Sequence, residues 1–360
     1  MALDSKLLRK LFATCAVLAV MVAAAGLLSS WDSHVLATAR AAARHASGLM
    51  SGVVNHDLTA DAAKKHRVID GAIANLKRYY IDQHVAQKMA GALLAHEKNG
   101  DDDAAKDGES LAVLLTRQMR DVSHDLHLDL VYSRDPLPEH PMAETPESFA
   151  RYRKAMEQEN CTFEKVEVLP HNIGYLKLNS FPDPAVCKPK ASAAMARLNQ
   201  VDAIIFDLRN NRGGEPAMVA LVGAYLFDHP EYWYNPREDT TRQSWTRSPV
   251  PGNKLAAKPV YVLTSARTSS GAEQFCYDLK MLKRATLVGE TTAGAAHSGV
   301  WHRIDDHFGM GIPEAKPINP FSKPDWEGTG VEPDVKVNAT SALKTAVNLA
   351  ESRLQKKQKK

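Results

Sequence analysis

A serine-containing segment offers a candidate nucleophile. Residues 265–270 follow a nearly all-apolar run, 260–264, and precede a helical pattern over 271–282. A serine at such a strand-to-helix turn exposes its hydroxyl, and unpaired N–H groups at the start of the helix lie beside it. These donors suit the oxyanion of an acyl-transfer intermediate, with Ser270 as the nucleophile. The simpler interpretation is a helix cap, in which Ser270 is the N-cap and Glu273 completes a capping box.

A second loop strengthens the chemical interpretation. Residues 207–214 also follow a buried strand pattern and precede a helical one, and they end in the glycine pair Gly213 and Gly214. Paired glycines let the backbone approach a substrate closely, and one of them could supply a second oxyanion donor. Taken alone, a glycine pair indicates only a turn.

The elements that must position these two loops alternate along the chain. We expect strands over 173–178, 203–208, 260–264 and 285–289, and helices over 191–198, 216–227 and 271–282. This alternation predicts an α/β layered domain with a largely parallel sheet. Residues 36 to about 130 instead show helical spacing, and a Pro-rich link and a helical pattern over 146–158 follow them.

Four ordered motifs give residues 172 to about 348 a resemblance to a known family. They lie at 207–214, 263–273, 283–292 and 326–334. This part of the chain resembles the catalytic core of the tail-specific (C-terminal processing) serine peptidase superfamily. It is most similar to the branch that contains the tricorn protease core and interphotoreceptor retinoid-binding protein. The resemblance implies a crotonase-like layered core with a mostly parallel sheet over 160–350, preceded by a small N-terminal helical domain over 36–134.

The resemblance also implies a role for individual residues. A serine hydroxyl needs a base within hydrogen-bond reach, and the base needs orientation. The implied site consists of the nucleophile Ser270, the general base His127, the acidic Glu327, and oxyanion-hole N–H groups from Gly271 and one of Gly213 and Gly214.

The chain departs from the family pattern in two ways. Many members use a serine–lysine dyad, but the position 25 residues after Ser270 is Ala295, so the base role moves to a histidine. Residues 133–166 leave no room for a PDZ domain. Two alternatives stay open, since His297 lies close to the missing lysine and is a rival base, and Glu290 is a rival for the acidic role.

These residues predict a serine peptidase that hydrolyses peptide bonds through an acyl-enzyme on Ser270, with a peptide or protein substrate and no cofactor. No His-Glu-x-x-His spacing indicates a metal site. The alternative is a non-catalytic binder of hydrophobic ligands or peptides on the same fold, which the retinoid-binding relative motivates. The net charge of +3 argues against a dedicated nucleic-acid binder.

The N-terminus predicts export. Lys6, Arg9 and Lys10 precede an uncharged run over 11–28, so residues 1–30 read as a signal peptide or a membrane anchor. We therefore expect a periplasmic or other extracytoplasmic protein, either soluble or associated with the inner membrane, of unspecified oligomeric state. In an oxidising compartment Cys161 and Cys187 could pair.

Overall fold

The computed structural model describes residues 62–137, 146–229, 232–234, 244–245, 250, 252–317, 322 and 325–358, with the backbone alone at 232–234, 244–245 and 358. The expected signal or anchor segment, 1–30, lies outside these residues. The chain divides into two compact units. Unit 1 comprises the described residues within 35–150 and 298–314, and unit 2 comprises those within 151–297 and 315–358.

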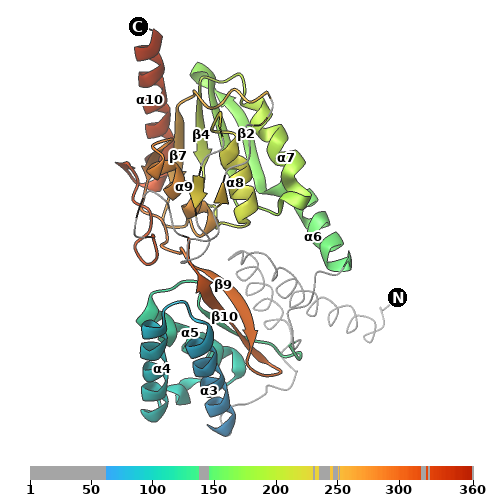
Figure 1. Ribbon diagram of the computed structural model, residues 1–360, viewed down its shortest axis with the longest axis vertical. Coiled ribbons are helices and arrows are strands. Elements are labelled where there is room, and N and C mark those ends of the chain that lie inside the picture. Colours follow the sequence, from blue (N-terminus) through green and yellow to red (C-terminus); the bar gives the residue numbers. More distant parts are fainter. Residues whose placement is uncertain are drawn as a thin grey trace, which may run out of the picture. The chain divides into compact units, whose positions relative to one another are not determined.

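Unit 1 combines three helices with a small sheet (Figure 1). The helices are α3 (Ala62–Tyr79), α4 (Gln83–Lys98) and α5 (Gly108–Ser123), and a 3-10 turn, η1 (Asp101–Ala104), joins the last two. Apolar side chains at helical spacing, such as Val68, Ile69, Ala72 and Leu76, are buried in its core. The helical pattern of this region therefore arises from one buried stripe on each helix.

The sheet of unit 1 brings together residues that are far apart in the sequence. Its strand order is β1 (Asp129–Tyr132), β10 (Phe308–Ala315) and β9 (Ser298–Arg303). Strand β1 pairs antiparallel with β10, so that Tyr132 lies opposite Phe308. Residues 298–314 therefore complete the core of unit 1, although the expected boundaries of 36–134 and 160–350 place them with the later part of the chain.

Unit 2 is built on a six-stranded sheet in the order β11-β8-β7-β4-β3-β2. All neighbouring strands are parallel except β2 and β3. The mostly parallel sheet predicted from the sequence is thus confirmed. The strands are β2 (Phe163–Leu169), β3 (Ile173–Leu178), β4 (Ala203–Asp207), β7 (Val260–Thr264), β8 (Thr286–Gly289) and β11 (Val335–Lys336).

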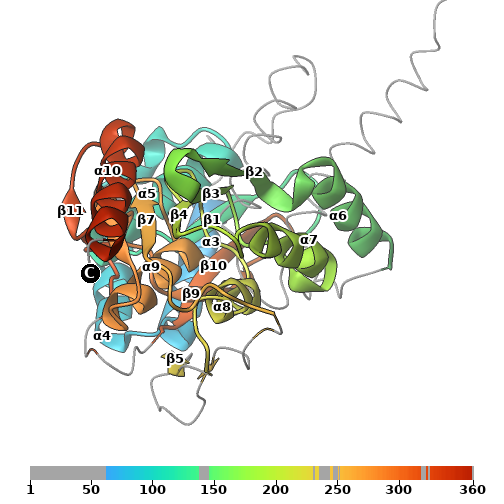
Figure 2. The same cartoon turned by 90° about the horizontal axis from the view of Figure 1, so that it is seen from above.

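Helices cover both faces of this sheet (Figure 2). Side chains alternate between the faces along a strand, so Ile204 and Phe206 of β4 pack with α7 (Pro184–Arg197), α8 (Pro216–Ala224) and α9 (Gly271–Met281). Ile205 and Ala203 face α10 (Ala339–Gln358), which presents three buried alanines. Because both faces are covered, the central strands β4 and β7 are buried along their whole length and almost entirely apolar. The remaining elements are α6 (Pro146–Gln158), η2 (Asn160–Thr162), η3 (Pro170–Asn172), β5 (Tyr232–Tyr234) and β6 (Ser244–Trp245).

A disulfide joins Cys161, just before β2, to Cys187 in α7. The sequence-based pairing is therefore confirmed. The third described cysteine, Cys276, is a buried thiol in α9, where it fills space between apolar neighbours.

Candidate active site

The backbone of Ser270 is strained. This residue lies between β7 and α9 with φ 54° and ψ −124°, outside the regions that non-glycine residues usually occupy. Such a conformation costs about 1–3 kcal/mol and persists only where the surrounding structure holds it. A strained serine at a strand-to-helix turn is the arrangement that exposes a nucleophilic hydroxyl in other hydrolases. Ser270 is also the N-cap of α9 in a capping box with Glu273, as the simpler interpretation predicted. Its strained backbone differs from the extended backbone of an ordinary N-cap, and this difference favours an added role as nucleophile.

The buried carboxylate of Glu273 holds this turn. Its Oε2 accepts the backbone N–H of Ser270 at 2.8 Å and that of Ala295 at 2.8 Å. Its Oε1 accepts the hydroxyl of Thr292 at 2.5 Å and the N–H of Gly294 at 2.7 Å. Burial raises the pKa of Glu273 to about 7, while these four donors favour the ionised form. One side chain therefore ties the serine turn to the segment that follows β8.

The glycine loop packs against the serine turn through backbone atoms. The N–H of Ser269 donates to the carbonyl oxygen of Asn211 at 3.1 Å. A Cβ atom on Gly213, whose φ is +102°, would lie 2.6 Å from the nitrogen of Gly271 and 2.8 Å from Cβ of Ser270. Both the positive φ and the contact distance require glycine at this position.

The backbone of Gly214 lies close to Gly271, the residue after Ser270. Phe181 donates its N–H to Gly213 and accepts from Glu215, both at 2.7 Å, so the N–H of Gly214 points away from this bridge. A Cβ atom on Gly271 would lie 3.2 Å from the nitrogen of Gly214, and the N–H of Gly271 belongs to the first turn of α9. The N–H of Gly213 instead donates to Asn211 Oδ1 at 2.8 Å. The geometry therefore favours Gly214 over Gly213 as partner of Gly271 in an oxyanion hole.

A buried ion pair supports the start of the glycine loop. Asp207 Oδ2 accepts Arg209 Nη2 at 2.6 Å and the hydroxyl of Tyr175 at 2.6 Å, while Arg209 Nε donates to Asp207 Oδ1 at 2.9 Å. Burial raises the pKa of Asp207, but the hydrogen bonds from Arg209 and Tyr175 outweigh it, and the pKa is lowered overall. The ionised carboxylate therefore stabilises the turn that leads to Gly213 and Gly214.

Glu327 also acts on backbone groups. Its Oε2 accepts the N–H of Ala296 at 2.5 Å and that of His297 at 2.9 Å. The indole N–H of Trp326 donates to the carbonyl oxygen of Ala295 at 3.2 Å, and the N–H of Gly328 donates to Gly294 at 2.9 Å. The Trp-Glu-Gly motif at 326–328 is thus hydrogen-bonded to the segment 294–297. Glu273 is hydrogen-bonded to the same segment at Gly294 and Ala295.

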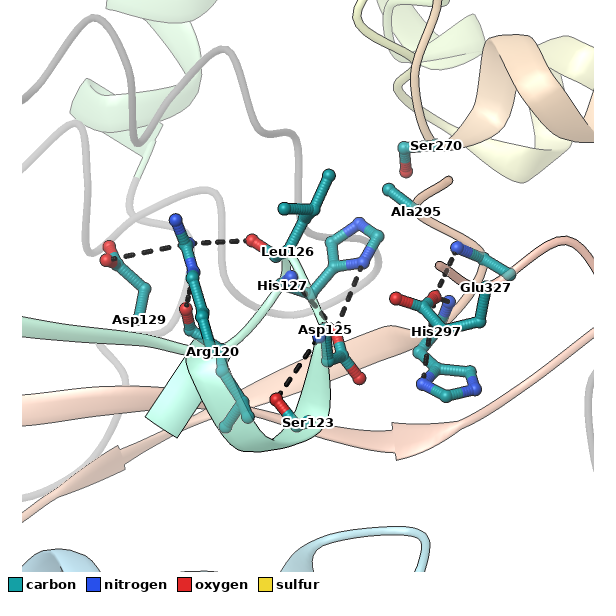
Figure 3. A network of polar contacts seen from close by, with 12 residues as sticks. Arg120, Ser123, Asp125, Leu126, His127, Asp129, Ser270, Ala295, His297 and Glu327 are labelled. Carbon is teal, nitrogen blue, oxygen red and sulfur yellow. Dashed lines mark hydrogen bonds and ion pairs between the residues drawn. The ribbon is translucent and has the colours of Figure 1, made fainter. Parts of the chain in front are cut away.

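The two alternatives left open by the sequence have other contacts. The His297 ring lies near two carboxylates, with Nδ1 3.7 Å from Glu327 and Nε2 3.8 Å from Asp325. Figure 3 shows this ring directed away from Ser270, whereas Ala295 lies beside the serine. Glu290 accepts the N–H of Ala339 at the start of α10 at 2.9 Å. His297 thus lies beside acidic groups and Glu290 binds the start of α10, and both stay alternatives to the predicted base and acid.

His127 belongs to unit 1, and Ser270 and Glu327 belong to unit 2, so the pairing of this histidine with the serine stays a prediction. Its ring lies close to a residue that the sequence did not single out: Nδ1 is 3.9 Å from Oδ1 of the fully buried Asp125 (Figure 3). The available signal was the spacing of an acid two residues before the histidine.

Comparisons with known proteins show which family this chain resembles. Residues 172–337 match the model of Peptidase family S41. A carboxyl-terminal-processing protease of Synechocystis is 26% identical over 192 residues, which are 53% of this chain and 44% of that protein. The chain thus spans less than half the length of the first relatives that it matches. The resemblance stated from the four motifs is confirmed.

Solved structures show the fold. A lipoprotein from Streptococcus agalactiae superposes with a TM-score of 0.52 at 14% identity, over 80% of this chain and 96% of that one. The tricorn protease superposes with a TM-score of 0.52 at 14% identity, over 82% of this chain and 37% of that one. At these identities the similarity concerns the arrangement of helices and strands.

Proposed function

We propose that this chain, whose residues 172–337 carry the core of peptidase family S41, is a serine-type peptidase that hydrolyses peptide bonds through an acyl-enzyme on Ser270. The observation that carries this proposal is the strained backbone of Ser270 at the start of α9, next to Gly271 and close to the backbone of Gly214. A capping serine has no need of such strain. A nucleophile does, because its hydroxyl must stand clear of the helix that begins after it.

The reaction follows from these groups. Ser270 Oγ attacks the carbonyl carbon of the scissile bond, and its proton passes to His127. The carbonyl oxygen becomes an oxyanion, which the N–H groups of Gly214 and Gly271 stabilise. The C–N bond then breaks, and the leaving amine takes the proton from the imidazolium. Water attacks the acyl-serine with the same base, which releases the carboxylic acid and restores the hydroxyl.

The acidic position has a supporting role in this proposal. Glu327 accepts two N–H groups of the segment 296–297, and Glu273 accepts those of Gly294 and Ala295. The two carboxylates therefore hold one segment from both ends. The methyl group of Ala295 in that segment stands where many relatives carry a lysine, so the base must come from elsewhere.

The substrate is a peptide or protein. Relatives are named for carboxyl-terminal processing, but this chain matches less than half of their length. We therefore propose peptide-bond hydrolysis for this chain without assigning the site of cleavage within a substrate. The chemistry requires no cofactor, since the nucleophile, the base and the oxyanion donors are all protein groups.

Export is also part of the proposal. The disulfide between Cys161 and Cys187 supports it, because such bonds persist in oxidising compartments and are rare in the cytosol. Within the part of the chain that the structure covers, no helix has the length and apolarity needed to cross a bilayer. The proposed signal or anchor is the segment 1–30, which could leave the protein either released or held at the inner membrane.

A fluorophosphonate probe tests the nucleophile. The probe should label the wild type and the Ser352→Ala control, which changes an exposed serine of α10, but not Ser270→Ala. Equal labelling of Ser270→Ala would contradict the proposal. The non-catalytic binder would instead be supported if the folded wild type is not labelled and if it binds peptide with the same affinity as Ser270→Ala.

A further inference from the structure

The turn that carries His127 is built around the carboxylate of Asp125. Helix α5 ends with His124 in the left-handed conformation, at φ 57°, and the N–H of Asp125 donates to the hydroxyl of Ser123 at 3.2 Å. Asp125 Oδ1 then accepts the backbone N–H of His127 at 3.0 Å. An aspartate that bonds the N–H two residues later forms a local turn. This turn brings the imidazole to the same side of the chain as the carboxylate that forms it.

A tyrosine fixes the other oxygen of the carboxylate. The hydroxyl of Tyr80, which directly follows α3, donates to Asp125 Oδ2 at 3.1 Å. Asp125 is fully buried, and Tyr80 is part of the apolar core of unit 1. A buried carboxylate requires hydrogen-bond donors and a positive partner. Tyr80 and the N–H of His127 supply donors, and the imidazole of His127, 3.9 Å away, can become positive.

An arginine from α5 holds the backbone on both sides of His127. Arg120 Nη2 donates to the carbonyl oxygen of Leu126 at 2.7 Å, and its Nε donates to that of Leu128 at 2.7 Å (Figure 3). The guanidinium also lies 3.9 Å from Asp129, so its charge has a carboxylate of its own. Each of the two acids in this segment therefore has its own basic neighbour: Asp129 lies near Arg120, and Asp125 lies near His127.

We propose that Asp125 positions His127 and stabilises its imidazolium, with the hydroxyl of Tyr80 fixing the carboxylate. This inference rests on the proposed function, in which His127 is the general base. Nδ1 of His127 is 3.9 Å from Oδ1, which is longer than a hydrogen bond. Contraction by about 1 Å follows when the ring takes a proton, since catalytic hydrogen bonds often tighten only in the reacting complex. Asp125 is a positioning residue, because a proton held on Nδ1, the atom that faces Asp125, makes Nε2 the basic nitrogen of the neutral ring.

The first test compares two buried aspartates of the same segment. We expect Asp125→Asn to lower kcat at least 1,000-fold with KM changed by less than threefold, as expected when an orienting carboxylate is lost. Asp129→Asn is the matched control, because it removes a buried carboxylate that serves Arg120, and its kcat should stay within tenfold of the wild type. Tyr80→Phe, which removes only the hydroxyl, should lower kcat about three- to tenfold. Equal losses in Asp125→Asn and Asp129→Asn would overturn the inference.

A measurement on the wild type keeps the inference testable if Asp125→Asn does not fold. Nitrogen-15 NMR of the imidazoles should show His127 as the tautomer protonated at Nδ1, the atom that faces Asp125. The tautomer protonated at Nε2 would overturn the inference.

His127→Ala separates this inference from the proposed function. If His127→Ala keeps full activity, the proposed base is wrong and the inference fails with it. If His127→Ala is inactive while Asp125→Asn keeps its kcat, the inference alone fails.

Discussion

Glu273 Oε2 accepts the backbone N–H of Ser270 at 2.8 Å, so a side chain in the first turn of α9 holds the backbone of the candidate nucleophile. The sequence predicted a capping box formed by Ser270 and Glu273, and the structure has both of its halves. The same carboxylate also accepts groups from residues 292–295, which come from beyond β8. A local capping interaction thus becomes a link between two loops of the site.

The raised pKa of Glu273 predicts a pH-dependent stability. Burial raises this pKa from 4.5 to about 7, so between these values the folded protein binds the proton more tightly than the unfolded chain. The contribution of the group to stability is therefore full below pH 4.5 and is lost as the pH rises to 7. Relative to Glu273→Gln, which does not titrate, the free energy of unfolding of the wild type should fall by about 3 kcal/mol over this range.

Denaturant unfolding at a series of pH values between 4.5 and 8 measures this difference. The other titrating groups are common to both proteins and cancel in the comparison. Wild-type and Glu273→Gln curves that run parallel across the range would contradict the raised pKa.

The close approach of the two loops predicts the effect of a single methyl group. Gly213→Ala would place Cβ 2.6 Å from the nitrogen of Gly271 and 2.8 Å from Cβ of Ser270, so the serine turn must shift. We expect the rate of fluorophosphonate labelling to fall at least 100-fold, since displacement by about 1 Å is enough for such a loss.

Gly252→Ala is the matched control for Gly213→Ala. Gly252 also has a positive φ, +75°, but its Cβ would meet nothing within 4 Å. Both variants incur the strain of a left-handed backbone, about 1–2 kcal/mol. Only Gly213→Ala should lose labelling, and equal rates in the two variants would show that strain alone, and not the contact with Ser270, governs the site.

The hydrogen bonds of Glu327 to Ala296 and His297 predict that the position of its side-chain oxygen matters more for activity than its charge. Glu327→Gln keeps an oxygen that can accept the N–H groups of Ala296 and His297, whereas Glu327→Ala leaves both without that acceptor. We expect kcat to fall about tenfold in Glu327→Gln and at least 100-fold in Glu327→Ala, because an unpaired buried donor costs about 1–3 kcal/mol and its segment must rearrange. Steady-state kinetics on a peptide substrate measures both, and equal losses would assign the role to the charge.

The strands of unit 2 could be predicted because their signal is local. Residues 260–264 are a mostly apolar run and residues 173–178 are apolar apart from Lys177, and the structure has strands with these same bounds. A parallel strand that is buried on both faces has no room for polar residues, so its limits can be read directly from the sequence. The loops after β4 and β7 follow from these strands, and they carry the glycine pair and Ser270.

Other parts of the molecule depend on distant contacts. Strand β1 was not expected, because it is only four residues long and its partner β10 begins at Phe308. The choice between Gly213 and Gly214 depends on the side chain of Asn211 and on the bridge to Phe181. Asp125 lies only two residues from His127, but its relation to Tyr80 requires the packing of two helices. Periodicity carries none of this information.

The disulfide predicts a measurable part of the stability of unit 2. Cys161 and Cys187 are separated by 26 positions, and closing a loop of this length reduces the entropy of the unfolded chain. On the chain-entropy model the bond contributes about 3–4 kcal/mol. The double variant Cys161→Ser/Cys187→Ser should lose this amount in denaturant unfolding, and adding a reductant should destabilise the wild type but not the variant.

Cys276→Ser is the control for the loss of a buried sulfur outside the bond, and it should keep its sensitivity to reductant. If the unfolding midpoint of the wild type does not change when reductant is added, the disulfide does not stabilise the protein.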